Sequence, residues 1–190
     1  MMKEMPGISK ELLLDRELLF ALRNSSTLKQ KTAEIFELLR DPVYRYLFRV
    51  LGNACEAEDL TQEVFLRLYT YLYNGQNVGN LRAWVFRVAH NLAVDQQRKK
   101  VVLGPLDANI SEQAQDPSPG IEQRLLEAEQ YQRLQTALAQ LTSQEKHCLE
   151  LRAEGLSYHE IAEIFEMRLP TLVKYLGRII RKLVNEVTYD

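Results

Sequence analysis

The sequence predicts an all-α protein of two small helical domains joined by a flexible linker. In residues 10–100, apolar side chains recur at helical spacing, and no sustained period-two alternation typical of strands appears. This periodicity is lost in residues 101–120, where three prolines and two glycines gather. It returns in residues 121–187. We therefore expect one domain on each side of a linker at residues 101–120.

Polar breakers divide the first domain into successive helices. The run Asn-Ser-Ser-Thr separates a helix from about Lys10 to Arg23 from a second at about Leu28 to Arg40. Asp41 and Pro42 predict the start of a third helix, because proline suits the first turn of a helix. This third helix should end near Gly52, since glycine readily adopts the conformation that closes a helix.

The next helix begins with acidic residues and leads into a loop. Glu58 and Asp59 favour the positive end of a helix dipole, and helical spacing continues to about Tyr73. Residues 74–80, with two glycines and three asparagines, form the clearest loop of this half. A further helix follows directly at residues 81–100.

This helix carries an apolar stripe and, beside it, a polar stripe. The apolar stripe has the spacing of a core face and consists of Leu81, Val85, Val88 and Leu92. The polar stripe combines groups that bind phosphates, read base edges and stack on unpaired bases. It consists of Arg87, Asn91 and Arg98, with Trp84 and Asp95 at its border and Lys99 and Lys100 at its end. A solvated helix face, with Asp95 and Arg98 paired at a gain of about 0.2–0.5 kcal/mol, is the alternative interpretation.

Composition narrows the classes of function. A net charge of −2 over 190 residues argues against indiscriminate coating of nucleic acid, so any basic surface must be local. No apolar run approaches the roughly 20 residues that span a bilayer, and the start lacks the features of a signal peptide, so we expect a cytoplasmic protein with no membrane insertion. The cysteines and histidines show no ligand spacing, and no catalytic motif appears. We expect no metal, no cofactor and no enzymatic activity.

The strongest local motif lies near the carboxyl end of the chain. Gly155 closes one helix, and Ser157 with Glu160 forms a capping box that starts the next. Small Ala162 allows a second helix to cross closely, and after a short turn Pro170 stands where the first turn of that helix would be. This order is typical of a DNA-binding helix-turn-helix, whose second helix enters the major groove.

The last helix of this motif, like the helices expected before it at residues 121–141 and 143–153, presents one face to the core. That face consists of Leu172, Leu176, Ile179 and Leu183. Base readout is predicted for Arg168, Thr171, Lys174 and Tyr175, and phosphate binding for Arg178 and Arg181. A plain helical hairpin with a solvated basic face is the alternative. We rank it lower, because glycine, capping box, small residue, turn and basic face occur together in the right order.

Three blocks spread over nearly the whole chain resemble the bacterial sigma factor family, in its extracytoplasmic-function (ECF) branch. AEDLTQEVFLR at residues 57–67 is similar to the core of the family's first conserved block. AWVFRVAHNLAVDQQRKK at residues 83–100 is similar to its W-x-x-x-I-A-x-N-x-x-x-D-x-x-R block. LQTALAQLTSQEKHCLELRAEGLSYHEIAEIF at residues 134–165 is similar to the start of its C-terminal domain. The resemblance implies a region 2-like helical bundle at 10–100 and a region 4-like helix-turn-helix domain at 121–187.

The resemblance implies a surface for core RNA polymerase. In the family, the D-L-x-Q-E helix docks on the clamp coiled coil of the largest core subunit, which here names Asp59, Gln62 and Glu63. These residues are spaced i, i+3 and i+4, so they share one face of a helix. From the sequence alone, a solvated amphipathic helix would look the same.

The helix at residues 81–100 resembles the element that opens the minus-ten box of a promoter and captures its non-template strand. Asn91 matches an asparagine that lies against an exposed base, and the loop at residues 75–80 matches the pocket for a flipped one. Melting costs a few kcal/mol per unstacked base, to be recovered by stacking, hydrogen bonds and phosphate contacts. The residues implied are Trp84, Arg87, Asn91, Asp95, Arg98, Lys99 and Lys100.

The helix-turn-helix resembles the domain that recognises the minus-thirty-five box. Around its turn, where the family usually has Gly and then Ser, this chain has Glu166 and Arg168. The linker also agrees with the ECF branch, whose members lack the middle domain of housekeeping sigma factors.

The expected function is therefore that of a sigma factor. Its expected partners are core RNA polymerase, promoter DNA as duplex and as melted non-template strand, and an anti-sigma factor. A stand-alone helix-turn-helix transcriptional regulator and a sigma mimic that occupies an anti-sigma factor remain alternatives. An enzyme acting on nucleic acid is more distant, because the sequence offers no clustered acidic, cysteine or histidine ligands.

Overall fold

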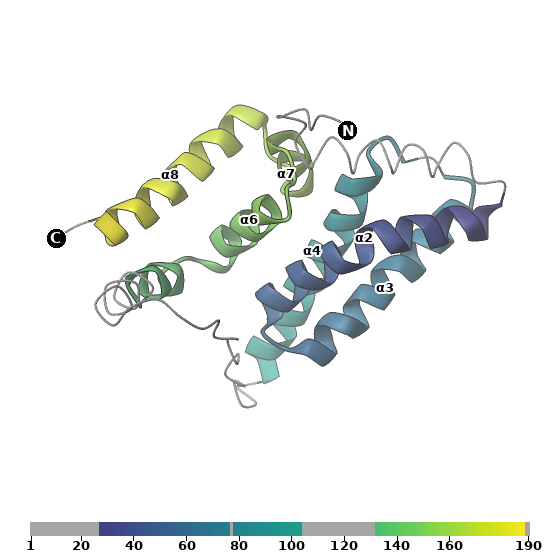
Figure 1. Cartoon of the computed structure of the whole chain (residues 1–190), viewed down its shortest axis with the longest axis horizontal. Coiled ribbons are helices and arrows are strands. Elements are labelled where there is room, and N and C mark those ends of the chain that lie inside the picture. The colour runs from purple at the N-terminus through teal and green to yellow at the C-terminus, as the bar shows by residue number, and fades with distance from the viewer. Residues whose placement is uncertain (1–26, 77, 104–131, 189–190) are drawn as a thin grey trace, which may run out of the picture.

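The computed structural model describes residues 27–76, 78–103 and 132–188, and every regular element in these ranges is helical (Figure 1). The predicted all-α class is thus confirmed for the described part of the chain. The helix expected at residues 10–23, most of the linker and the start of the helix expected at 121–141 lie outside the described residues.

Helix α2 runs without a break from Leu28 to Leu51, with Pro42 inside it. The prediction of two helices with a boundary at Arg40 is wrong. An interior proline removes one backbone hydrogen bond and costs about 3 kcal/mol. Packing outweighs this cost, because Leu39 and Val43, on either side of the proline, are fully buried. The helix ends as predicted at Gly52, whose φ of 69° lies in the left-handed region.

Helix α3 spans Ala54–Tyr73 and packs along α2. It begins earlier than the acidic pair at residues 58 and 59, because the Asn53 side chain accepts a hydrogen bond from the Glu56 backbone N–H at 3.0 Å and caps the helix there. Val64 and Leu68 are fully buried against the neighbouring helices.

Helix α4 spans Leu81–Leu103 and closes the first domain against α2 and α3. It continues past residue 101, where the sequence predicted the linker to begin. Leu81 and Val85 are buried as predicted, whereas Val88 and Leu92 are only partly buried. Much of the deeply buried surface of α4 comes instead from Phe86, Ala89 and Ala93.

The second domain contains residues 132–139, which are helical, followed by α6 (Ser143–Ala153), α7 (Tyr158–Ile164) and α8 (Leu169–Thr188). Capping boxes start α6 at Thr142 and Glu145 and start α7 at Ser157 and Glu160, the second of these as predicted. The predicted core positions Leu172, Leu176 and Ile179 of α8 are buried and Leu183 is partly buried.

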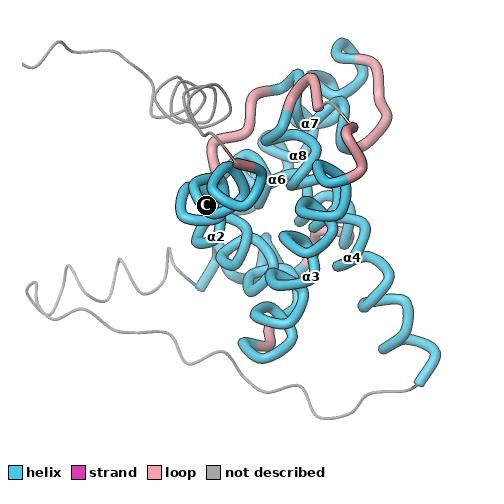
Figure 2. Tube along the Cα trace, turned by 90° about the vertical axis from the view of Figure 1, so that its right-hand side faces the viewer, coloured by secondary structure: helices cyan, strands magenta, loops and turns pink. Residues whose placement is uncertain are grey.

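The two domains touch, with α7 against α4 and α6 against α2 (Figures 1 and 2). As a result, buried apolar residues of both domains form one continuous cluster, which extends from Ile35 in α2 to Ile179 in α8. The helix that the sequence predicts to bind melted DNA therefore lies between the core of its own domain and the second domain.

A first prediction concerns the turn between α7 and α8, where Glu166 has a φ of 53°. A non-glycine residue is strained by roughly 1–2 kcal/mol in this region. Glycine removes this strain but loses more conformational entropy on folding, which offsets part of the stabilisation. We expect Glu166→Gly to raise the free energy of unfolding by about 0.5–1 kcal/mol. Denaturant titration followed by circular dichroism measures it. Glu166→Ala keeps the strained φ and should show no such gain; a loss of stability in the glycine variant would contradict the account.

Candidate functional site

The loop before α4 is held by a cap and by an aromatic contact. The Asn80 side chain accepts a hydrogen bond from the Ala83 backbone N–H at 3.0 Å, which fixes the start of the helix. Trp84, one turn into α4, is partly buried, and its ring lies 4.8 Å from that of Tyr71 in α3. Trp84 is thus engaged in packing between α3 and α4, with part of its surface left accessible.

The polar stripe predicted on α4 is exposed along most of its length. Asn91, Asp95, Arg98 and Lys99 are exposed, and no ion pair joins Asp95 to Arg98 among the described contacts. The alternative interpretation was a solvated helix face with Asp95 paired to Arg98, and this pair does not form in the described structure. Lys100 is also exposed, but its ammonium lies 2.7 Å from the Glu56 carboxylate of α3.

Arg87 differs from the rest of the stripe because it contacts the second domain. Its Nη2 donates a hydrogen bond to the backbone carbonyl of Glu163, in α7, at 2.8 Å. A side chain predicted to bind the melted strand is therefore occupied by the helix-turn-helix domain in this arrangement.

The predicted polymerase-binding residues lie on the outer face of α3. Asp59 and Gln62 are exposed, and Glu63 accepts a hydrogen bond from Arg67 at 2.7 Å on the same helix surface. Large apolar side chains accompany them, which the sequence pattern did not predict. Leu66 and Tyr73 are 62% and 70% exposed, and exposed apolar side chains that gather on one helix are a feature of protein-binding surfaces.

The helix-turn-helix presents its predicted DNA-binding residues at the start and along the outer side of α8. After α7 the Met167 N–H donates to the Ala162 carbonyl at 2.9 Å, which closes the end of that helix, and Ala162 itself is buried. The side chains that are exposed there are Arg168, Thr171, Lys174, Arg178 and Arg181.

Tyr175 is the member of this predicted set that is partly buried. Burial raises the pKa of its hydroxyl, and the guanidinium of Arg178 lies 5.5 Å from its ring centroid. The side chain therefore contributes to the packing of the domain, and the face of its ring contacts Arg178.

Paired charges line the contact between the domains. From the first domain, Arg45 Nη2 lies 2.8 Å from Oε2 of Glu154, and Arg49 pairs with both Glu154 and Glu150. Arg82, only 3% exposed, donates from Nη2 to the Glu154 carbonyl at 2.8 Å. The second domain is thus held by carboxylates and carbonyls at the carboxyl end of α6.

A cluster of two histidines and a tyrosine lies at the centre of this contact. The Tyr46 hydroxyl is 2.7 Å from His147 Nδ1 and 3.1 Å from His90 Nδ1, and the two Nδ1 atoms are 3.1 Å apart. Burial lowers the pKa of both imidazoles to about 4, and the neighbouring His90 adds to the effect at His147. Both rings are therefore neutral at pH 7.

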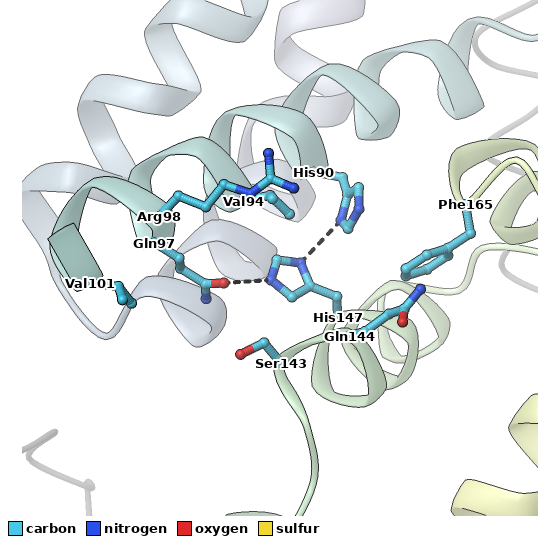
Figure 3. A pocket seen from close by; sticks show the side chains of 9 residues that line it. All are labelled: His90, Val94, Gln97, Arg98, Val101, Ser143, Gln144, His147 and Phe165. Atoms are coloured by element: carbon cyan, nitrogen blue, oxygen red, sulfur yellow. Dashed lines mark hydrogen bonds between the residues drawn. The ribbon is translucent and has the colours of Figure 1, made fainter.

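The two histidines of this cluster line a cavity of about 780 Å³ between α4 and α6 (Figure 3). Val94, Val101 and Phe165 supply apolar lining, and Arg98 lies at its edge beside Gln97. Across the described residues, no three His, Cys, Asp or Glu side chains gather where they could hold a metal ion. The same residues contain no helix long and apolar enough to cross a membrane.

A second prediction follows from the different surroundings of the two cysteines. Cys55 is exposed at the start of α3, whereas burial raises the pKa of Cys148 to about 12. A thiol reagent at pH 8 should titrate Cys55 quickly and Cys148 at least about a thousandfold more slowly, because the thiolate is the reactive form. Cys55→Ser should abolish the fast reaction in native protein. Equal rates for both thiols would contradict the placement of α6 in the core.

Comparison with family models assigns both domains. Residues 35–101 match the model described as Sigma-70 region 2, and residues 131–183 match Sigma-70, region 4.

Curated relatives and solved structures agree with these matches. The chain is 37% identical over 79 residues to the ECF RNA polymerase sigma factor SigW of Bacillus subtilis, which covers 42% of each chain. It is 34% identical over 167 residues to BldN of Streptomyces coelicolor, an ECF sigma factor, covering 82% of this chain and 60% of the relative. The chain thus spans about half the length of the curated relatives it matches.

The fold is also found in solved structures. The sigma factor RpoE in complex with NepR from Bartonella quintana has a TM-score of 0.62 at 20% identity, covering 83% of this chain and 97% of that one. CnrH in complex with the cytosolic domain of CnrY has a TM-score of 0.60 at 19% identity, covering 90% and 94%. With both conserved regions present in order and ECF proteins among its relatives, the chain belongs to the sigma-70 family of RNA polymerase sigma factors, in its ECF branch.

Proposed function

We propose that this chain acts in the cytoplasm as a sigma factor: it binds core RNA polymerase, recognises a promoter through two boxes and melts the downstream one. One observation carries the proposal. Three exposed polar surfaces, on α3, α4 and α8, lie within the two regions that match sigma-70 regions 2 and 4. The domains proposed are 10–100 and 121–187, with the linker at 101–120 between them.

The α3 surface is the proposed polymerase-binding site. Asp59, Gln62 and Glu63 supply charge and hydrogen bonds, and exposed Leu66 beside them supplies apolar area that a partner can cover. The combination suits a protein partner better than it suits DNA, whose phosphates repel carboxylates.

The α4 and α8 surfaces are the proposed DNA-binding sites. On α4, exposed Asn91 has an amide that can pair with a base edge, while Arg98 and Lys99 hold the backbone. At the start of α8 and along it, exposed Arg168, Thr171 and Lys174 are the residues proposed for base readout, with Arg178 and Arg181 for phosphate. Binding of one domain to its box raises the effective concentration of the other domain at the second box, so two modest affinities combine into a high one. Promoter selection of this kind requires no catalytic step.

An anti-sigma factor is the proposed regulatory partner. One solved structure of similar fold is a complex of the sigma factor RpoE with the anti-sigma factor NepR, and another is a complex of CnrH with the cytosolic domain of CnrY. The cavity between α4 and α6, with its apolar lining, lies between the two proposed DNA-binding domains.

The third prediction tests polymerase binding by charge reversal. Asp59→Lys with Glu63→Lys should weaken binding to core RNA polymerase by at least tenfold, because each lost charged contact costs about 1.5–3 kcal/mol. Fluorescence anisotropy at fixed salt measures the affinity.

The matched control reverses two acidic residues with the same spacing on another helix, Glu37→Lys with Asp41→Lys, both exposed on α2. This variant should bind core as wild type does. If the wild-type chain does not bind core polymerase, the proposal is contradicted, and the stand-alone helix-turn-helix transcriptional regulator or the sigma mimic is favoured.

The fourth prediction separates base reading from phosphate binding on α4. Promoter fragments would first be selected from random DNA with the reconstituted polymerase. Asn91→Ala should lose about 1–3 kcal/mol of discrimination between selected and scrambled minus-ten strands. Lys99→Gln should weaken both equally and lower the salt slope by about one. Equal losses on both strands for Asn91→Ala would contradict a base-reading role for this asparagine.

A further inference from the structure

The contact between the domains occupies a surface that promoter binding requires. Arg87 of the proposed minus-ten site is bonded to the Glu163 carbonyl, and Arg98 borders the cavity that α4 shares with α6. In the same contact Arg82 is buried against Glu154. DNA could reach the Arg87 guanidinium only after the second domain has moved away.

The arrangement is also too compact for the proposed promoter. Boxes named minus-ten and minus-thirty-five lie about 25 base pairs apart, or roughly 85 Å along straight duplex. Helices α4 and α8 are roughly 35 and 30 Å long, so even end to end they would not span that length. Because the domains touch, this closed arrangement cannot engage both boxes.

The hydrogen bonds at the centre of the contact require a neutral His147. The Gln97 amide N–H₂ donates to the Val50 carbonyl at 3.1 Å, which leaves its oxygen facing His147 Nε2 at 3.2 Å. His147 Nε2 must therefore donate, and its Nδ1 must accept the hydroxyl proton of Tyr46. His90 Nδ1 then donates to the Tyr46 oxygen, and every member of the network has a partner.

Proton uptake by this pair breaks the network. A second proton on His147 puts an N–H group at Nδ1, the atom that accepts the hydrogen bond of the Tyr46 hydroxyl in the neutral state. If both histidines are charged, they also repel each other, because their Nδ1 atoms are only 3.1 Å apart. The Tyr46 hydroxyl is fully buried, so little water is present to screen the two charges.

Among the described residues, no group that neighbours the two histidines offers an unpaired negative charge to compensate. From α6, Glu150 and Glu154 already pair with Arg49 and Arg45 of α2, and Cys148 is neutral because burial raises its pKa to about 12. From α2, burial raises the pKa of Tyr46, so it too is neutral.

The groups that face the pair from the remaining elements are cationic or uncharged. Arg98 of α4 lines the same cavity and adds positive charge, while the ring of Phe165, after α7, lies 4.8 Å from that of His90 and carries none.

We propose that the contact between the domains is an autoinhibitory lock of the free chain, and that proton uptake by His90 and His147 opens it. The inhibitory part of this proposal rests on the proposed sigma function, because only a promoter-binding protein is silenced by closure. The conformational part does not, because it concerns the two domains alone.

The direction with pH follows from where the protons bind. In the closed state both imidazoles titrate near pH 4, below the ordinary value of 6.5, so the closed state binds fewer protons than an open state with solvated rings. The stability of closure is therefore complete above pH 6.5 and is lost as the pH falls toward 4. Between pH 7.5 and 5.5, each histidine should shift the equilibrium toward the open state about tenfold, and the pair about 100-fold.

The test is a distance measurement on the full chain. Dyes on exposed Cys55 and on Asn185→Cys, at opposite domains, report separation by energy transfer. We expect high transfer at pH 7.5 and a reversible fall at pH 5.5 with helical circular dichroism unchanged. An unchanged separation at pH 5.5 would overturn the proposal.

Variants assign the effect to the pair. His90→Asn with His147→Asn keeps a polar atom near each Nδ1 but cannot take up a proton, so the pH dependence should disappear. His159→Asn, at an exposed position outside the lock, is the matched control and should keep the full response. If the double variant loses its helical signal, His90→Asn alone should reduce the response from about 100-fold to about tenfold. A full response in either lock variant would overturn the proposal.

Inhibition is tested at constant pH. Glu154→Gln removes the pairs with Arg45 and Arg49 and lies outside the proposed polymerase and DNA surfaces. At pH 7.5 it should lower energy transfer and tighten binding of the chain to the selected minus-ten strand. Only the open fraction of the chain exposes Arg87, and the apparent dissociation constant is the intrinsic one divided by that fraction. Open domains without tighter binding would overturn the inhibitory role. Wild-type failure to bind core, with the pH response intact, would instead count against the proposed function alone.

Discussion

The fully buried hydroxyl of Tyr46 is the interaction on which the arrangement of this molecule depends. It contacts His90 of α4 and His147 of α6, so a single atom of α2 joins three helices and both domains. A buried hydroxyl without a partner costs roughly 1–3 kcal/mol, and this cost fixes how α6 can approach. The ion pairs of Arg45 and Arg49 with Glu150 and Glu154 lie around this point and hold the second domain in this arrangement, because the Glu154 side chain is only 3% exposed and its carboxylate depends on its partners.

This constraint gives α4 two sets of neighbours. Its inner face packs on α2 and α3 through Phe86, Ala89 and Ala93, while Arg87 and His90 face the second domain. The remaining exposed part carries Asn91 and Lys99, which we propose bind DNA. One helix thus connects the stability of its domain, the closure of the chain and the proposed recognition of a promoter.

Periodicity and capping were enough to predict the helical class, the end of α2 at Gly52 and the capping box at Ser157, because these depend on local backbone chemistry. The break at Arg40 was wrong, since the packing of Leu39 and Val43 overrides the local preference of Pro42. The contact between the domains could not be predicted. His90 and His147 are 57 residues apart and carry no motif, and only tertiary structure brings their rings together. Most of the predicted site residues on α3, α4 and α8 are exposed, whereas Glu63, Trp84, Arg87 and Tyr175 are partly buried. The binding roles of all of them remain predictions.

Run-off transcription with purified core polymerase on a library of genomic fragments would show whether this chain directs transcription initiation. We expect discrete transcripts that appear only when the chain is added, from templates that share two sequence boxes. The same transcripts without the chain, or none with it while core binding is intact, would show that the chain is not a sigma factor.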